Sequence, residues 1–248
     1  MVITTTAVGF SFSSVGLAIC GFWFYKAFQK IGGQRAGKTI GILLSALFLG
    51  IALQHGILAL GGLFFANNSE ALYAILTIDY LVLAITAAFS AYMAFYILLP
   101  KFSPWPMTVA TFLLGVLETG LIITAHPQPF IDTKNSIDWN LPGWLNALPY
   151  ILLLINIGSV FAIFTKNFFH TTTRTGKSIS FVIAILALAG IINVSILFTP
   201  LLSAPVLRTY FFAILMGTIG LIFIVFFLLI PAIKSWYEKN LDKKNSEE

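Results

Sequence analysis

The sequence predicts an all-α polytopic membrane protein with seven transmembrane helices, and three observations support this fold class. Of its 248 residues, 58% are hydrophobic and only 9% are charged, whereas a soluble domain carries about 25% charged residues. Seven long apolar stretches follow one another with short connections. Each reaches the roughly 20 residues that a helix needs to cross a hydrocarbon layer about 30 Å thick. The basic residues lie almost entirely on one side of these stretches.

The apolar stretches predict helices because they are continuous. Strands of a membrane β-barrel would alternate apolar and polar residues over about 10 positions. Lipid offers no hydrogen-bond partners, so a backbone that crosses it in one continuous segment must pair its own groups, as a helix does. We expect one transmembrane domain over residues 1–236 and a short cytoplasmic tail over residues 237–248. The expected helices cover residues 7–28, 39–66, 71–99, 106–125, 144–168, 178–199 and 206–233.

The distribution of basic residues predicts the orientation. Every lysine and arginine except Lys134 and Arg208 lies at the end of the first or fifth stretch, in the connection after the first, third or fifth stretch, or in the C-terminal tail. Basic connections remain in the cytoplasm, so we expect the N-terminus outside and the C-terminus inside. We place the protein in the inner membrane of a bacterium or archaeon, with the lipid bilayer as its first partner. Because helix ends account for the net charge of +5, we expect no nucleic-acid partner.

The connection over residues 126–143 is the longest on the predicted outer side. It is rich in prolines, which stiffen the backbone, and in acidic and aromatic side chains. We therefore expect it to fold as a short hairpin or lid. The residues concerned are Pro127, Pro129, Asp132, Asp138, Trp139 and Pro142.

Ionisable and amide side chains within a span are costly and mark functional sites. At 1.5 Å of rise per residue, five such residues lie roughly 9–18 Å from the predicted outer ends of their helices, and a sixth lies near the outer surface. The inner half of the bundle has almost no counterpart. This asymmetry predicts an outward-facing pocket that binds a ligand or a proton. Its six expected residues are His55, Asp79, Glu118, Asn156, Asn193 and Arg208.

Helical periodicity supports this interpretation. Asp79, Thr86 and Ser90 are spaced seven and four residues apart, so they share one face of their helix, as Thr111 and Glu118 do on the next. Polar stripes of this kind are typical of a bundle interior. The alternative is that these side chains only hold neighbouring helices in register, through hydrogen bonds worth about 0.6 kcal/mol each.

The sequence does not favour an enzyme. His55, His126 and His170 are its three histidines, and they lie on separate segments at different depths, so we expect neither a metal site nor a haem. Neither G-x-S-x-G nor H-E-x-x-H occurs. We expect no catalytic residue and no cofactor, and an acid pair of Asp79 and Glu118 is the enzymatic alternative that remains.

Two families of seven-helix proteins offer a comparison. The stretch Ile78-Asp79-Tyr80-Leu81 resembles the counterion strip of microbial rhodopsins. Those proteins bind retinal through a lysine in the middle of the seventh helix, and residues 206–233 contain no lysine. We therefore reject retinal as a covalent cofactor.

The layout of the chain resembles the seven-helix N-terminal sensor region of bacterial histidine kinases. The shared features are short inner loops, a basic turn after the fifth helix and a long outer connection with Trp139 and Pro142-Gly143-Trp144. This resemblance implies a sensor. Because only residues 237–248 follow Trp236, we expect no kinase in this chain, and the signal would pass through a membrane or cytoplasmic partner.

Three functions remain open from the sequence. The first is a receptor or sensor-like module whose pocket faces outward. The second is a transporter or channel for a proton, a cation or a small solute, in which Asp79 and Glu118 carry the charge. The third is an accessory subunit of a larger membrane complex.

Overall fold

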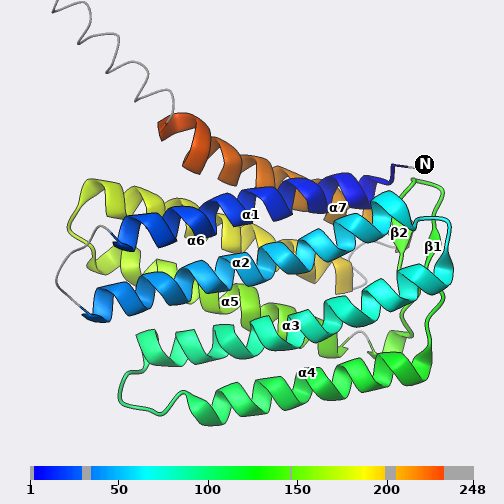
Figure 1. Ribbon diagram of the computed structural model, residues 1–248, viewed down its shortest axis with the longest axis horizontal. Helices are drawn as coiled ribbons and strands as arrows, with labels where there is room; N and C mark the ends of the chain where they lie inside the picture. The colour runs from blue at the N-terminus through cyan, green and yellow to red at the C-terminus, as the bar shows by residue number, and fades with distance from the viewer. Residues whose placement is uncertain (1–2, 30–34, 146, 199–204, 232–248) are drawn as a thin grey trace, which may run out of the picture.

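The computed structural model describes residues 3–29, 35–145, 147–198 and 205–231. Within these residues seven helices are long and apolar enough to cross a membrane, which confirms the predicted helical class and helix number. The helices form one elongated bundle (Figure 1). They are α1 (Thr5–Gln29), α2 (Arg35–Phe64), α3 (Ser69–Leu98), α4 (Trp105–Ala125), α5 (Ala147–His170), α6 (Arg174–Phe198) and α7 (Pro205–Ile224).

Several helix ends differ from the predicted ones because hydrogen bonding, and not hydropathy, decides where a helix begins. α6 begins at Arg174 instead of residue 178, since Thr173 caps it by accepting a hydrogen bond from Gly176 N at 3.2 Å. Asn68 caps α3 in the same way. At the other end of the chain a π-helical segment, η2 (Val225–Leu229), continues α7. The predicted domain end at residue 236 and the tail lie outside the described residues.

The helices are not equivalent in their neighbours. α1 packs between α2 and α7, and α5 packs between α3 and α6. α4 lies at the edge of the bundle and packs mainly against α3 (Figure 1). The N-terminus and a small β-hairpin lie at one end of the bundle, which we call the hairpin end. The opposite end, which holds the α3–α4 and α5–α6 connections, is the tail end.

The connection between α4 and α5 contains the expected hairpin. Strands β1 (Phe130–Ile131) and β2 (Ile137–Asp138) pair in antiparallel fashion. The Asp132 carboxylate holds the turn between them, because its Oδ1 accepts a hydrogen bond from Ser136 N at 2.9 Å. Its Oδ2 accepts another from Thr209 Oγ1 of α7 at 3.1 Å. The turn of the hairpin is therefore attached to α7.

The hairpin is also attached to the start of α1. Thr5 N donates to Asn135 O at 2.8 Å, and Ile137 N donates to Thr6 Oγ1 at 2.9 Å. These bonds satisfy backbone groups at a helix N-terminus and at the end of a very short strand, where neither element supplies its own partners. The hairpin therefore links the first and last helices of the bundle.

A cluster of five phenylalanines fills the centre of the bundle toward the tail end. Phe24 and Phe48 stack with ring centroids 5.5 Å apart, and Phe164 and Phe223 pack on Phe48, each at 6.2 Å. Phe227 of η2 packs on Phe223 at 5.9 Å. We call these five residues the aromatic cluster. All five are buried, and the buried polar residues of this half, such as Ser45 and Ser180, carry small uncharged hydroxyl groups.

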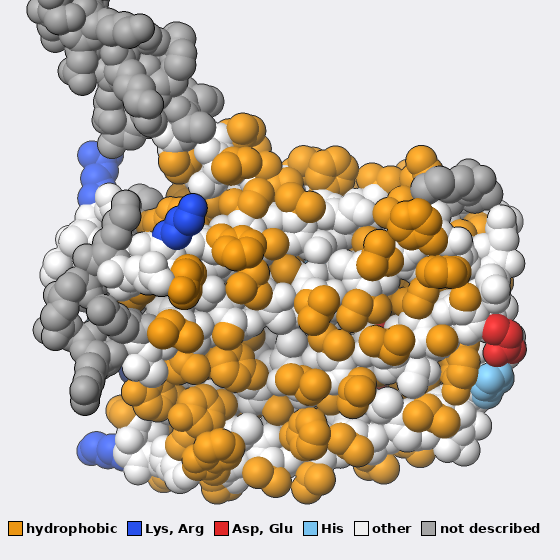
Figure 2. All heavy atoms as spheres, in the orientation of Figure 1, with side chains coloured by type: hydrophobic (Ala, Val, Ile, Leu, Met, Phe, Trp, Pro, Cys, Tyr) orange, Lys and Arg blue, Asp and Glu red, His pale blue; other side chains and the backbone are white. Residues whose placement is uncertain are grey.

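The surface is apolar along the sides of the bundle. On the face shown in Figure 2, hydrophobic side chains cover the middle, lysine or arginine side chains lie toward the tail end, and acidic and histidine side chains lie at the hairpin end. This pattern matches a layer of lipid between two aqueous sides and indicates a membrane protein.

Candidate functional site

A cavity of about 420 Å³ lies inside the bundle. Its walls come from all helices except α4, among the described residues, together with residues 138–141 that follow the hairpin turn. The lining begins with exposed Asn140 at the hairpin end. It ends at Phe48 and Phe223, which belong to the aromatic cluster. The cavity therefore occupies the hairpin half of the bundle, and the aromatic cluster closes it toward the tail end.

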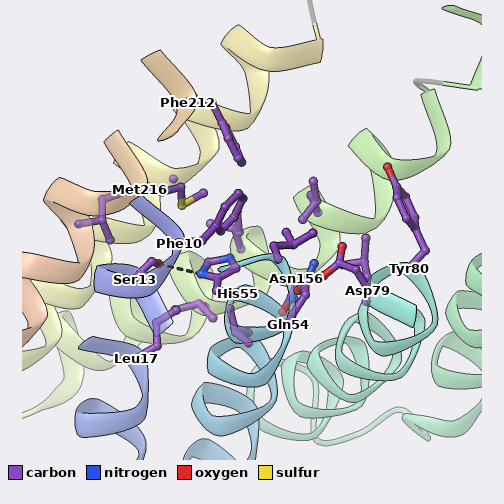
Figure 3. A pocket seen from close by; sticks show the side chains of 18 of the residues that line it. Phe10, Ser13, Leu17, Gln54, His55, Asp79, Tyr80, Asn156, Phe212 and Met216 are labelled. Carbon is purple, nitrogen blue, oxygen red and sulfur yellow. Dashed lines mark hydrogen bonds between the residues drawn. The ribbon is translucent and has the colours of Figure 1, made fainter. Parts of the chain in front are cut away.

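Five buried polar side chains line the middle of this cavity (Figure 3), and we call them the polar cluster. They come from four helices, and each is a polar residue within an otherwise apolar span. Asp79, Gln54 and Asn156 gather in one place, and His55 lies beside them. The five residues are Ser13 of α1, Gln54 and His55 of α2, Asp79 of α3 and Asn156 of α5.

His55 and Gln54 reach different neighbours because consecutive residues on a helix point about 100° apart. His55 turns toward α1, where its Nδ1 lies 2.7 Å from Ser13 Oγ. Its ring packs against Phe10 in an edge-to-face arrangement, with centroids 5.2 Å apart. Gln54 turns toward α3, where it forms a hydrogen bond with the Asp79 carboxyl group. Two adjacent residues of α2 therefore join three helices around the cavity.

Asp79 and Gln54 retain unused acceptors. Neither Asp79 Oδ1 nor Gln54 Oε1 has a hydrogen-bond partner among the described residues. Both side chains are 4% exposed. An acceptor buried without a partner costs about 1–3 kcal/mol. Two such acceptors beside a cavity are the arrangement that a hydrogen-bond donor would complete.

Asn156 has a structural bond on its other side. Its Oδ1 accepts a hydrogen bond from Ser90 Oγ of α3 at 2.5 Å. This bond holds α5 in register with α3, as the alternative interpretation of the polar stripe expects. Asn156 nevertheless lines the cavity as well, so one side chain serves both the packing of the helices and the lining of the cavity.

Glu118 lies beside the cavity but does not line it. Its side chain on α4 is fully buried, and both carboxyl oxygens lack a hydrogen-bond partner within the described residues. It is close enough to Asp79 and Tyr80 for electrostatic interaction with both. Glu118 thus forms a buried acid pair with Asp79 across the α3–α4 contact, one acid inside the cavity and one behind it.

Of the two remaining predicted residues, Asn193 does not belong to this cluster. Asn193 is buried, and its Nδ2 donates to Phe212 O at 3.2 Å, which joins α6 to α7. It is not among the lining residues. Arg208 belongs to α7, and its side chain lies outside those that the structure describes. The cavity therefore unites His55, Asp79 and Asn156 of the six predicted residues.

Sequence reasoning missed several lining residues. Gln54 could have been predicted, because placing its amide within a span costs as much as placing that of Asn156 there. Ser13 carries none, since hydroxyl side chains are common in membrane helices and bond to their own backbone. Trp139 and Asn140 belong to the outer connection, and only the folded hairpin shows that they cover the cavity.

The arrangement is that of a binding site with a polar centre and apolar walls. Among the described residues, no group of three His, Cys, Asp or Glu side chains is placed to hold a metal ion. No protein-family model matches the sequence, and no curated protein resembles it at a significant level.

Proposed function

We propose that this protein is a receptor or sensor-like membrane module that binds a small ligand in the cavity. The observation that supports this function is the asymmetry of the bundle interior: a cavity with a buried polar cluster in one half and an aromatic cluster in the other. Its volume lies within the range of about 300–1,000 Å³ that is usual for small-molecule sites. The resemblance in layout to the sensor region of histidine kinases favours the same function.

We infer that the hairpin end faces the outside of the cell and that the C-terminus is cytoplasmic. The excess of lysine and arginine in the connections at the tail end supports this orientation. The cavity is then open toward the outside of a bacterial or archaeal cell membrane, and a ligand enters past Asn140.

The hairpin offers a route from ligand to helix movement. Trp139 lines the cavity, and the hairpin beside it holds the start of α1 through Thr6 and the start of α7 through Thr209. A ligand that contacts Trp139 more favourably in one arrangement of these helices shifts the population toward that arrangement. A partner protein at the tail end then reads the change, which is the signalling step of the proposed function.

Cysteine accessibility tests whether the cavity opens outward. Cys20 is the only cysteine, so a Cys20→Ala protein provides a background without thiols. A membrane-impermeant cationic thiosulfonate is then added to intact cells that carry a single Gln54→Cys substitution. Thiolates form in water and not in lipid, so we expect Gln54→Cys to react from outside.

Leu53→Cys is the matched control. Leu53 precedes Gln54 on the same helix at nearly the same depth, but its side chain is 57% exposed on the apolar exterior, where lipid surrounds it. We expect no reaction at this position. Equal reaction at both positions, or no reaction at Gln54→Cys from outside, would count against an outward cavity, and Ser13→Cys repeats the test if Gln54→Cys is not produced.

The acid pair favours a second function, transport of a proton or cation. Asp79 faces the cavity and Glu118 lies behind it, so the two carboxyl groups would pass an ion from one to the other. The aromatic cluster, which closes the path to the tail end, favours the sensor instead. Flux of protons or sodium ions through the purified protein in liposomes, abolished by Glu118→Gln, would establish transport and replace the proposed function.

A further inference from the structure

We infer that the cavity takes a small amphiphilic amine, whose ammonium group donates hydrogen bonds to Asp79 Oδ1 and Gln54 Oε1. This inference rests on the proposed function and names the chemical class of its ligand. Both oxygens belong to side chains that are more than nine-tenths buried and line the cavity, and both lack a partner among the described residues. An ammonium group has three donors and no acceptor, so it complements two unpaired acceptors.

The charge of the site distinguishes an amine from other donors. An alcohol also donates, but it leaves the carboxyl group of Asp79 without an opposite charge. An anionic ligand would meet that carboxyl group, and the described lining residues include no lysine or arginine to balance it. Charge-assisted hydrogen bonds are roughly twice as strong as neutral ones. A cationic donor is therefore the head group that this polar cluster fits best.

The walls around the polar cluster determine the rest of the ligand. Phe10 and Phe212 lie with ring centroids 5.7 Å apart, and Met216 lies near them at the same side of His55 (Figure 3). Thioether and aromatic groups accommodate apolar or aromatic bodies. Aromatic faces also attract a cation that lies within about 6 Å of the ring centroid. The expected ligand thus joins an ammonium group to a compact apolar or aromatic body.

Thermal unfolding of the purified protein tests the ligand class. Cys20 is the only cysteine and is fully buried, so a thiol-reactive fluorophore reports unfolding without any added label. Three probes share one ring and differ in their head group: 2-phenylethylamine, 2-phenylethanol and phenylacetate. We expect only the amine to raise the unfolding temperature in a saturable way, because a ligand that binds the folded state stabilises it.

Substitutions then assign the effect to the site. Asp79→Asn keeps the shape of the side chain and removes its charge, so we expect the apparent affinity for 2-phenylethylamine to fall at least about tenfold. Glu70→Gln is the control, since it neutralises an exposed acid at the start of the same helix that does not line the cavity. It lies about 13 Å from Asp79 along α3, beyond the distance over which an exposed charge acts in physiological salt, so we expect a change of less than about threefold. If Asp79→Asn fails to fold, Gln54→Met removes the second acceptor with little change in volume.

The outcomes separate this inference from the proposed function. Stabilisation by 2-phenylethanol or phenylacetate equal to that by the amine, or amine binding that survives Asp79→Asn, overturns the amine while ligand binding in the cavity stands. If none of the three probes binds, the amine is likewise wrong, and the reaction of Gln54→Cys from outside decides separately whether the cavity is an outward site.

Discussion

The tight packing of α1 against α7 depends on glycine, and it allows a quantitative prediction. The two helices meet where Gly16 faces Gly220. A Cβ atom placed on Gly16 would lie 2.3 Å from Gly220 O and 3.0 Å from its carbonyl carbon. These are backbone atoms, so no side chain can rotate away. Gly16→Ala therefore forces the two helices apart by roughly 1 Å, and a gap of that size removes a quarter to a half of the dispersion attraction between the facing atoms.

The cost of this clash is best measured by comparison with an alanine substitution at a second glycine. Overpacking of this kind costs about 1–3 kcal/mol, while alanine gains up to about 1 kcal/mol over glycine in helix propensity. Gly158→Ala on α5 has the same gain and no clash, because a Cβ there meets nothing within 4 Å. The difference between the two variants isolates the clash, and we expect Gly16→Ala to unfold roughly 2–12 °C below Gly158→Ala.

Unfolding is followed through the buried thiol of Cys20. Because Cys20 lies one turn beyond Gly16 on α1 and the substitution could itself expose the thiol, size-exclusion chromatography after heating provides an independent measurement. Should Gly16→Ala unfold at or above the temperature of Gly158→Ala by both measurements, the two backbones do not touch at this point and the α1–α7 contact does not depend on glycine.

Three further changes test other parts of the fold. Phe48→Ala removes the ring at the floor of the cavity and should cost about 3–5 kcal/mol, so an unfolding temperature equal to that of the unaltered protein would contradict the role of the aromatic cluster. Thr6→Val removes the acceptor of Ile137 N–H. The unpaired donor costs about 1–3 kcal/mol, so a protease added at the hairpin end should cut the hairpin faster, and an unchanged cutting rate would show that this anchor is unimportant. Ser90→Ala removes the bond to Asn156 and should cost only about 0.6 kcal/mol, at most roughly 1.7; a larger loss of stability would mean that this bond does more than set the register of α3 and α5.

Much of the fold is predictable because it follows from local properties. Seven apolar stretches become seven helices long enough to cross a membrane, because a continuous apolar segment can pair all its backbone groups internally only as a helix. The spacing of Asp79, Thr86 and Ser90 predicts that they share a face, and all three are buried. The prolines and polar residues of the outer connection predict a hairpin, which the structure confirms. In each of these cases, neighbours in the sequence decide the outcome.

Which polar residues line the cavity does not follow from neighbours in the sequence. Asp79 and Glu118 have the same chemistry and similar predicted depths, yet Asp79 lines the cavity and Glu118 lies behind it. The difference arises because α4 lies at the edge of the bundle and packs mainly against α3. Asn156 and Asn193 also differ, because Asn156 lines the cavity whereas Asn193 faces the contact between α6 and α7.

The sequence by itself determined the helices of this protein, their apolar character and the polar side chains that lie within them, because hydropathy and helical periodicity are properties of short segments. Only the tertiary structure decided which of those side chains meet, that Gln54 and Ser13 belong with them, and that the hairpin joins α1 to α7 above the cavity. Those facts depend on the order and rotation of the helices in the bundle, which are set by packing between residues far apart in the chain.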